Sequence, residues 1–141
     1  MIDKIAIIGL GSIGSKYLKI LRNNFPRIEV IVVRSGKGIQ SLQKDINIKV
    51  IHSIDELIGN NIDAAIICSP ATSHIKQAVK LANAGINVLI EKPLSDSLNG
   101  ISELVDKIKK NKIIAHVGYL LRYDPSAIAF KNYIDKNTIG K

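Results

Sequence analysis

Three glycines near the start of the chain have the spacing of a loop that binds phosphate. They follow the pattern G-x-G-x-x-G as Gly9, Gly11 and Gly14. An apolar run over 5–8 precedes them, and Ser12 and Ile13 begin a stretch with apolar residues at helical spacing. The first glycine permits a tight turn, the second lets the backbone approach a pyrophosphate, and the third lets the helix pack on the strand. Because a helix N-terminus attracts anions through its free N–H groups, the pattern predicts a dinucleotide site. A tight turn without a ligand is the alternative.

The residues after the second apolar run indicate which dinucleotide this loop prefers. In NAD-binding domains an Asp or Glu about 20 residues after the glycines binds the ribose 2′-hydroxyl. Here the run over 28–33 is followed by Arg34 and Ser35. An arginine attracts a 2′-phosphate, which a carboxylate would repel. We therefore expect a preference for NADP over NAD. A solvated basic turn is the alternative, because arginine also stacks on the adenosine of NAD.

Three polar clusters follow later apolar runs and are candidates for the rest of the site. They occupy 69–74 (S-P-A-T-S-H), 91–93 (E-K-P) and 118–123 (G-Y-L-L-R-Y). Ligands of an open parallel sheet bind beyond the carboxyl ends of its strands. These clusters are therefore expected at one edge of the sheet, beside the glycine loop.

Alternating strand and helix patterns supply the scaffold for these clusters. Apolar runs typical of strands buried on both faces occur over 5–8, 28–33, 48–51, 64–68, 87–90 and 113–117. Stretches of helical periodicity separate most of them, including a weak helix over 39–44. This alternation predicts an α/β fold, a doubly wound, Rossmann-like parallel sheet of about six strands with helices on both faces.

Local signals predict where helices begin and which side they bury. The first helix starts at about Ser12, and its expected apolar stripe is Ile13, Tyr17, Ile20 and Leu21. The helix before the last strand has the expected inner stripe Leu98, Ile101, Leu104, Val105 and Ile108. Ser53 and Glu56 predict a capping box. Asp124 followed by Pro125 predicts the start of a last helix.

Length, charge and composition exclude several classes of protein. The 141 residues suffice for one domain, and no apolar run approaches the ~20 residues that span a bilayer. The start of the chain has no signal-peptide pattern, and the single cysteine, Cys68, excludes an internal disulfide or a cysteine-built metal site. Both features favour a cytoplasmic protein. The net charge is +8, but aromatic residues make up only 4%, which leaves few stacking platforms for bases. We therefore expect neither nucleic acid nor a membrane as a partner.

Four blocks of the chain together resemble the glucose–fructose oxidoreductase / inositol dehydrogenase (Gfo/Idh/MocA) family. They are G-x-G-x-x-G over 9–14, S-P-x-x-x-H over 69–74, A-G-x-x-V-L-x-E-K-P over 84–93, and V-G-Y-x-x-R-Y-x-P over 117–125. The resemblance covers nearly the whole chain. It implies an NAD(P)-dependent oxidoreductase that acts on a sugar, a sugar derivative or a cyclitol, with the hydride carried by the cofactor.

The resemblance also assigns roles to single residues. Lys92 is the lysine that exchanges the proton beside the nicotinamide and contacts the substrate. Further cofactor contacts are implied for Ser69, Pro70, His74 and Glu91. For His74 the alternative is a polar residue in the first turn of a helix, without a role in binding. Arg122 and Tyr123 match an arginine–aromatic pair near the substrate and the domain junction, and interdomain packing is the alternative role for them. Ala71 departs from the asparagine that the family often has, which puts one cofactor contact in question.

The resemblance also bears on domain organisation. We expect residues 1–123 to form the dinucleotide-binding domain and 124–141 a connecting helix toward a C-terminal substrate domain that this chain lacks. The chain is therefore expected to be truncated, with a homo-oligomeric longer form. A stand-alone dinucleotide-sensing regulatory domain is the alternative function. A DNA-binding protein is disfavoured because the basic residues are scattered along helix faces.

Overall fold

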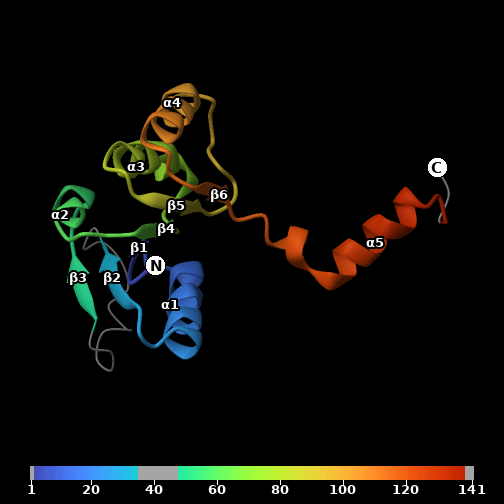
Figure 1. Cartoon of the computed structure of the whole chain (residues 1–141), viewed down its shortest axis with the longest axis horizontal. Helices are drawn as coiled ribbons and strands as arrows, with labels where there is room; N and C mark the ends of the chain where they lie inside the picture. The colour runs from blue at the N-terminus through green and yellow to red at the C-terminus, as the bar shows by residue number, and fades with distance from the viewer. Residues whose placement is uncertain (1, 35–47, 139–141) are drawn as a thin grey trace.

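A parallel sheet forms the centre of the chain (Figure 1). The structure is a computed structural model that describes residues 2–34 and 48–138. Its strands are β1 (Lys4–Ile8), β2 (Glu29–Val33), β3 (Lys49–Ile51), β4 (Ala64–Ile67), β5 (Asn87–Ile90) and β6 (Ala115–Val117). Its helices are α1 (Ser12–Asn24), α2 (Ile54–Ile58), α3 (Ala71–Asn83), α4 (Ile101–Asn111) and α5 (Pro125–Asp135), with a 3₁₀ turn, η1 (Leu120–Tyr123), before α5.

The strand order within the described ranges is β3-β2-β1-β4-β5-β6, with every neighbouring pair parallel. The chain moves outward from β1 to β3 and then returns to the other side of β1 with β4. This reversal creates a crevice between the carboxyl ends of β1 and β4, where ligands of doubly wound folds bind. The predicted Rossmann-like sheet with helices on both faces is confirmed.

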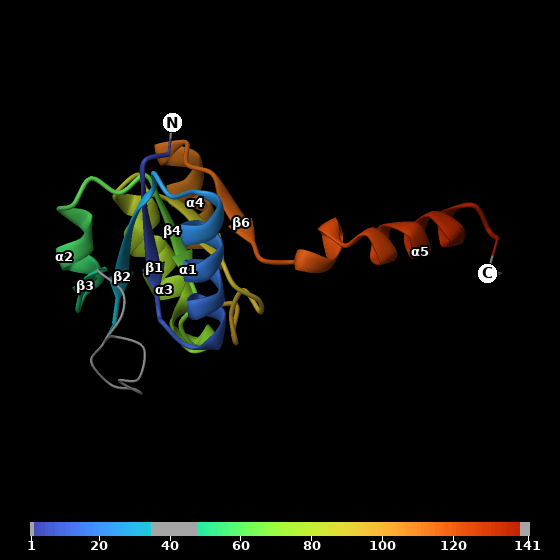
Figure 2. The ribbon, with the colours of Figure 1, turned by 90° about the horizontal axis from the view of Figure 1, so that it is seen from below.

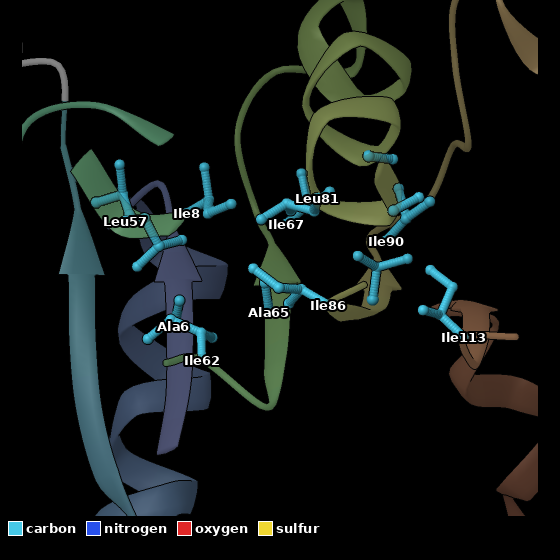
Figure 3. Close-up of a cluster of buried hydrophobic side chains, with 14 of the residues drawn as sticks. Ala6, Ile8, Leu57, Ile62, Ala65, Ile67, Leu81, Ile86, Ile90 and Ile113 are labelled. Carbon is cyan, nitrogen blue, oxygen red and sulfur yellow. The ribbon is translucent and has the colours of Figure 1, made fainter. Parts of the chain in front are cut away.

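Two apolar cores lie on opposite faces of the sheet. Since successive side chains of a strand point to opposite faces, Ala6 and Ile8 contribute to one core and Ile5 and Ile7 to the other. The larger core lies under α2, α3 and α4, and Figure 3 shows part of it. The smaller core lies under α1, on the face opposite those three helices (Figure 1). This arrangement holds the start of α1 and the start of α3 on either side of the crevice.

The predicted buried stripe of α1 is wrong in part. Leu18 and Leu21 are buried, whereas Ile13 and Ile20 are 43% and 41% exposed. The cause is the close approach of Gly14 to the preceding loop, described below, which sets the rotation of the helix about its axis. The two isoleucines consequently lie on the flank of the helix.

The predicted stripe of α4 is also wrong at its first position. Leu98 is 86% exposed because α4 begins only at Ile101, after Gly100 adopts a left-handed conformation with φ +80°. Leu98 therefore lies before the helix, where helical spacing does not apply. Leu104 is buried, and Ile101 and Ile108 pack against the larger core, whereas Val105 is 39% exposed.

The predicted helix caps are largely confirmed. The Asp124 carboxylate accepts hydrogen bonds from the backbone N–H groups of Ser126 and Ala127 at 2.9 and 3.0 Å. The Ser53 hydroxyl accepts from Glu56 N at 3.1 Å, but the Glu56 carboxylate accepts from His52 N at 3.3 Å, so the reciprocal half of the capping box is shifted by one residue. The predicted helix over 39–44 lies outside the described residues.

The last elements, η1 and α5, extend away from the sheet (Figure 2). Neither contains a buried residue. Large apolar side chains exposed on them are Leu120, Leu121, Tyr123, Ile128, Phe130, Tyr133 and Ile134. Of the helices in 2–34 and 48–138, none has the length and apolar character needed to cross a bilayer.

Candidate functional site

A cleft of about 1110 Å³ opens at the carboxyl ends of β1, β2, β3 and β4. Its walls come from the glycine loop, the ends of these strands, α2 and the first turns of α3. It therefore occupies the crevice where the strand order reverses. Within the described ranges, no group of three or more His, Cys, Asp or Glu side chains could hold a metal ion.

Two of the three loop glycines are required by the packing of the protein itself. Gly9 has φ +90°, and a Cβ there would lie 3.0 Å from backbone atoms of Cys68 and Ser69. A Cβ on Gly14 would lie 2.1 Å from the carbonyl oxygen of Gly9. Real Cβ atoms do not approach other atoms so closely, so a side chain at Gly14 would push α1 away from β1.

Gly11 is different, because nothing in the described protein requires a glycine there. It has φ −78°, and no atom lies within 4 Å of the position a Cβ would take. The residue is exposed and lines the cleft. The absence of a side chain at Gly11 therefore matters to whatever enters the cleft.

The N-terminus of α1 also faces the cleft without a partner of its own. It has no side-chain cap and no acidic residue in its first turn. Ser12 and Ser15 line the cleft, and among the described residues the buried Ser15 hydroxyl has no hydrogen-bond partner. Uncapped N–H groups and an unpartnered hydroxyl together suit the phosphate oxygens of a dinucleotide.

Several cationic side chains line the cleft. Arg34 lines it directly after β2, where its N–H donates to the Ile51 carbonyl and its own carbonyl lies 3.1 Å from His52 Nδ1. On the opposite wall, Lys76 and Lys80 project from α3. Lys80 Nζ lies 2.9 Å from both carboxylate oxygens of Asp55. Ser35, also predicted to contact the cofactor, lies outside the described residues.

The loop between β4 and α3 contributes a second wall. Ser69 and Pro70 line the cleft, and the Ser69 hydroxyl donates to Gln77 Oε1 at 2.6 Å. His74 is only 1% exposed and is not part of the cleft wall. Its Nε2 lies 2.7 Å from the Ser69 carbonyl and its Nδ1 3.0 Å from the Pro93 carbonyl. The structure thus places His74 between two loops, with both ring nitrogens directed at backbone oxygens.

The E-K-P segment follows β5, beside the β4 end of the cleft. Glu91 is 7% exposed, and its Oε1 accepts a 2.7 Å hydrogen bond from the Tyr17 hydroxyl. Lys92 is exposed, and the Lys92–Pro93 peptide bond is cis. Burial, followed by the negative charge of Glu91, raises the pKa of Cys68 to about 12. Burial, the hydrogen bond and the charge of Glu91 likewise raise the pKa of Tyr17.

Not every predicted residue is brought to the cleft. Arg122 and Tyr123 lie in η1, where both are exposed, and neither lines the cleft. Ile13 is exposed in the first turn of α1 but is likewise not a lining residue. Glu91 and Lys92 lie beyond the lining residues as well.

Sequence reasoning missed one wall of the cleft. Four polar residues on α3 line it at spacing i, i+3, i+4 and i+7: Ser73, Lys76, Gln77 and Lys80. This spacing marks one helix face, and it was visible in the sequence as a polar stripe opposite the apolar one. Tyr17 was missed as a hydrogen-bonding residue because its position fits an apolar stripe.

Comparison with known proteins agrees with this geometry. Residues 4–119 match the family model described as an oxidoreductase family with an NAD-binding Rossmann fold. Scyllo-inositol 2-dehydrogenase (NAD(+)) of Bacillus subtilis (strain 168) is 31% identical over 140 residues, which cover 96% of this chain and 41% of that protein. A 4-carboxy-2-hydroxymuconate-6-semialdehyde dehydrogenase of Sphingobium sp. is 31% identical over 127 residues, 87% of this chain and 40% of that protein.

A solved structure gives the same result for the fold. Myo-inositol 2-dehydrogenase from Lactobacillus plantarum superposes with a TM-score of 0.86 at 28% identity, covering all of this chain and 43% of that one. The chain spans about 40% of the length of the relatives it matches. Since the family model covers most of the chain, from β1 to the residue before η1, the chain belongs to the Gfo/Idh/MocA oxidoreductase family, within its NAD-binding Rossmann domain.

Proposed function

We propose that this chain forms the cofactor-binding part of an NAD(P)-dependent oxidoreductase that acts on a cyclitol, a sugar or a sugar derivative. The observation that carries the proposal is Gly11, which opens onto the cleft at the uncapped start of α1 although the protein's own packing does not require a glycine there. The dehydrogenases named above, two of which act on inositols, support the substrate class.

The residues present fit a dinucleotide. The first turn of α1, from Ser12, would hold the pyrophosphate with backbone N–H groups, assisted by the Ser15 hydroxyl, which has no partner in residues 2–34 and 48–138. Ser69 and Pro70 would contact the nicotinamide half from the opposite wall. When bound, the nicotinamide would accept or donate the hydride.

Lys92 would exchange the proton of the reaction at its Nζ. The hydroxyl of a sugar or cyclitol must lose a proton as its carbon loses a hydride, and the neutral amine form of Lys92, which follows a strand end, would accept it. Glu91 would hold the backbone of Lys92 from the buried side. Arg122 and Tyr123 would contact the substrate only with η1 turned toward the cleft or in a larger assembly. His74 would act indirectly, through the loops that it joins.

NADP is proposed as the preferred dinucleotide. The ribose that carries the 2′-phosphate binds near the end of the second strand in such folds. Arg34 occupies that end here, whereas Glu29 is at the opposite end of β2. Lys76 adds a positive charge on the facing wall, while Asp55 offsets that of Lys80. The family description and the Bacillus relative name NAD, so the proposed preference departs from the cofactor in those two names.

Calorimetric titration of the chain with NADPH and NADH tests the proposal, together with Gly11→Ala. We expect the substitution to weaken dinucleotide binding at least about tenfold, because the methyl group would occupy the space that a pyrophosphate needs, and to leave the melting temperature unchanged. Gly59→Ala is the matched control, because its Cβ would make only an ordinary van der Waals contact, 3.9 Å from the Glu56 carbonyl oxygen, and Gly59 does not line the cleft. If neither dinucleotide binds the unaltered chain at millimolar concentration, the proposal is wrong.

A further inference from the structure

A hydrogen bond between Tyr17 and Glu91 joins two parts of the site that are 74 residues apart. Tyr17 lies in the second turn of α1, the helix that begins at the glycine loop. Glu91 directly follows β5 and precedes Lys92. The Tyr17 hydroxyl donates to Glu91 Oε1 at 2.7 Å, which lies within the usual range for a hydroxyl bonded to a carboxylate.

The Glu91 carboxylate is largely buried, and both of its oxygens have close neighbours. Its other oxygen, Oε2, accepts from the backbone N–H of Lys92 at 3.2 Å. Gly118, after β6, packs so closely that a Cβ there would lie 3.0 Å from Oε1. Among the described residues no salt bridge with Lys, Arg or His reaches this carboxylate. Among the described residues, the Tyr17 hydroxyl is therefore the one side-chain donor that compensates the burial of the Glu91 carboxylate.

The residue on the other side of Lys92 is also anchored. The carbonyl oxygen of Pro93 lies 3.0 Å from Nδ1 of His74, in the first turn of α3. α1 and α3 cover opposite faces of the sheet. Lys92 is thus held between two fixed neighbours, one tied to each helix, while its own side chain is exposed.

We propose that Tyr17 is a positioning residue for Lys92. By holding Glu91, it ties the backbone of Lys92 to the helix whose first turn faces the cleft. An anion bound at that first turn steadies α1, and the Tyr17–Glu91 bond transmits this order to Lys92. The inference rests on the proposed function for the identity of the anion and for the role of Lys92, whereas the Tyr17–Glu91 bond is part of the structure itself.

Amide hydrogen exchange of the ¹⁵N-labelled full chain, measured by NMR for the original protein and Tyr17→Phe, tests the inference. In the ligand-free protein we expect the Lys92 amide to exchange at least about tenfold faster in Tyr17→Phe, since a bond to a charged acceptor is lost. Tyr133→Phe is the control, because Tyr133 is exposed on α5. It should leave the Lys92 amide unchanged, and a thermal melt checks that both variants are folded.

Addition of NADPH separates this inference from the proposed function. In the original chain NADPH should slow exchange at Ser12 and Ile13 and also at Lys92, whereas in Tyr17→Phe only the first two should slow. Equal Lys92 exchange in the ligand-free original chain and the folded variant would overturn the inference. So would slowing at Ser12 and Ile13 of the original chain without slowing at Lys92. If neither NADPH nor NADH slows exchange at any of these amides, the proposed function fails, and the ligand-free comparison still decides the role of Tyr17.

Discussion

Gly14→Ala should destabilise the free protein strongly, although alanine is the better helix former. The new methyl carbon would lie 2.1 Å from the Gly9 carbonyl oxygen and 3.4 Å from Ile7 Cγ2. Because Gly9 O belongs to the backbone, the loop and α1 must separate by about 1 Å, which disturbs a close-packed interior. The separation would loosen Leu18 and Leu21, both buried beneath the same helix.

The magnitude follows from two opposing effects. Overpacking of this kind costs about 1–3 kcal/mol or more, and here the upper end applies because no flexible side chain can give way. Replacing glycine by alanine within a helix stabilises the folded state by at most about 1 kcal/mol. The net loss is about 2 kcal/mol, which lowers the melting temperature of a chain of this size by about 8 °C.

Urea and thermal unfolding followed by circular dichroism, without ligand, would measure this change. Gly11→Ala is the paired comparison, since its methyl group would lie more than 4 Å from every atom of the described residues, and its free energy of unfolding should stay within about 0.5 kcal/mol of the original. An alanine at position 14 that leaves the stability unaltered would refute the packing argument for the glycine loop.

The cofactor preference, the proposed role of Lys92, the reactivity of Cys68 and the acid stability can each be tested. Arg34→Asp should weaken NADPH binding at least about tenfold and spare NADH in calorimetry, because a carboxylate repels the 2′-phosphate. Lys92→Ala, in a form long enough to turn over, should abolish turnover and retain NADPH binding. The Cys68 thiol should react with a disulfide reagent at pH 8 far more slowly than free cysteine, since burial and the charge of Glu91 raise its pKa to about 12. Two backbone N–H groups, at 2.8 Å each, lower the pKa of Asp63; this stabilisation is present above the ordinary pKa of 3.8 and lost as pH falls through the lowered value.

Each of these has a clear contrary outcome. Equal losses for NADPH and NADH would remove Arg34 from the specificity argument. Turnover by Lys92→Ala at the original rate would exclude its proton transfer. Rapid labelling of Cys68 at pH 8 would show that the thiol is more accessible than the structure places it. For Asp63, the measurement is the urea midpoint between pH 6 and pH 2. Asp63→Asn should flatten its acid dependence, and an unchanged pH profile would contradict the role of the two hydrogen bonds.

The sequence alone was sufficient for the strands and for the glycine loop. Strand residues such as Ile7 and Ile67 are fully buried, and strands buried on both faces need continuous apolar runs that are visible without a structure. The spacing of Gly9 and Gly14 could be recognised equally well. Each glycine allows a close backbone contact that recurs wherever a strand turns directly into a helix. The Asp124 cap was predicted from local geometry for the same reason.

Only the tertiary structure decided which side of α1 is buried and what the polar residues beneath the site do. Helical spacing identifies the apolar stripe of a helix but not which edge of that stripe is buried. The contact of Gly14 with Gly9 determined the rotation of α1 about its axis and left Ile13 exposed. The bonds of Tyr17 to Glu91 and of His74 to Pro93 join residues 74 and 19 positions apart. Such pairs leave no local pattern, because they depend on which strand ends the fold brings side by side.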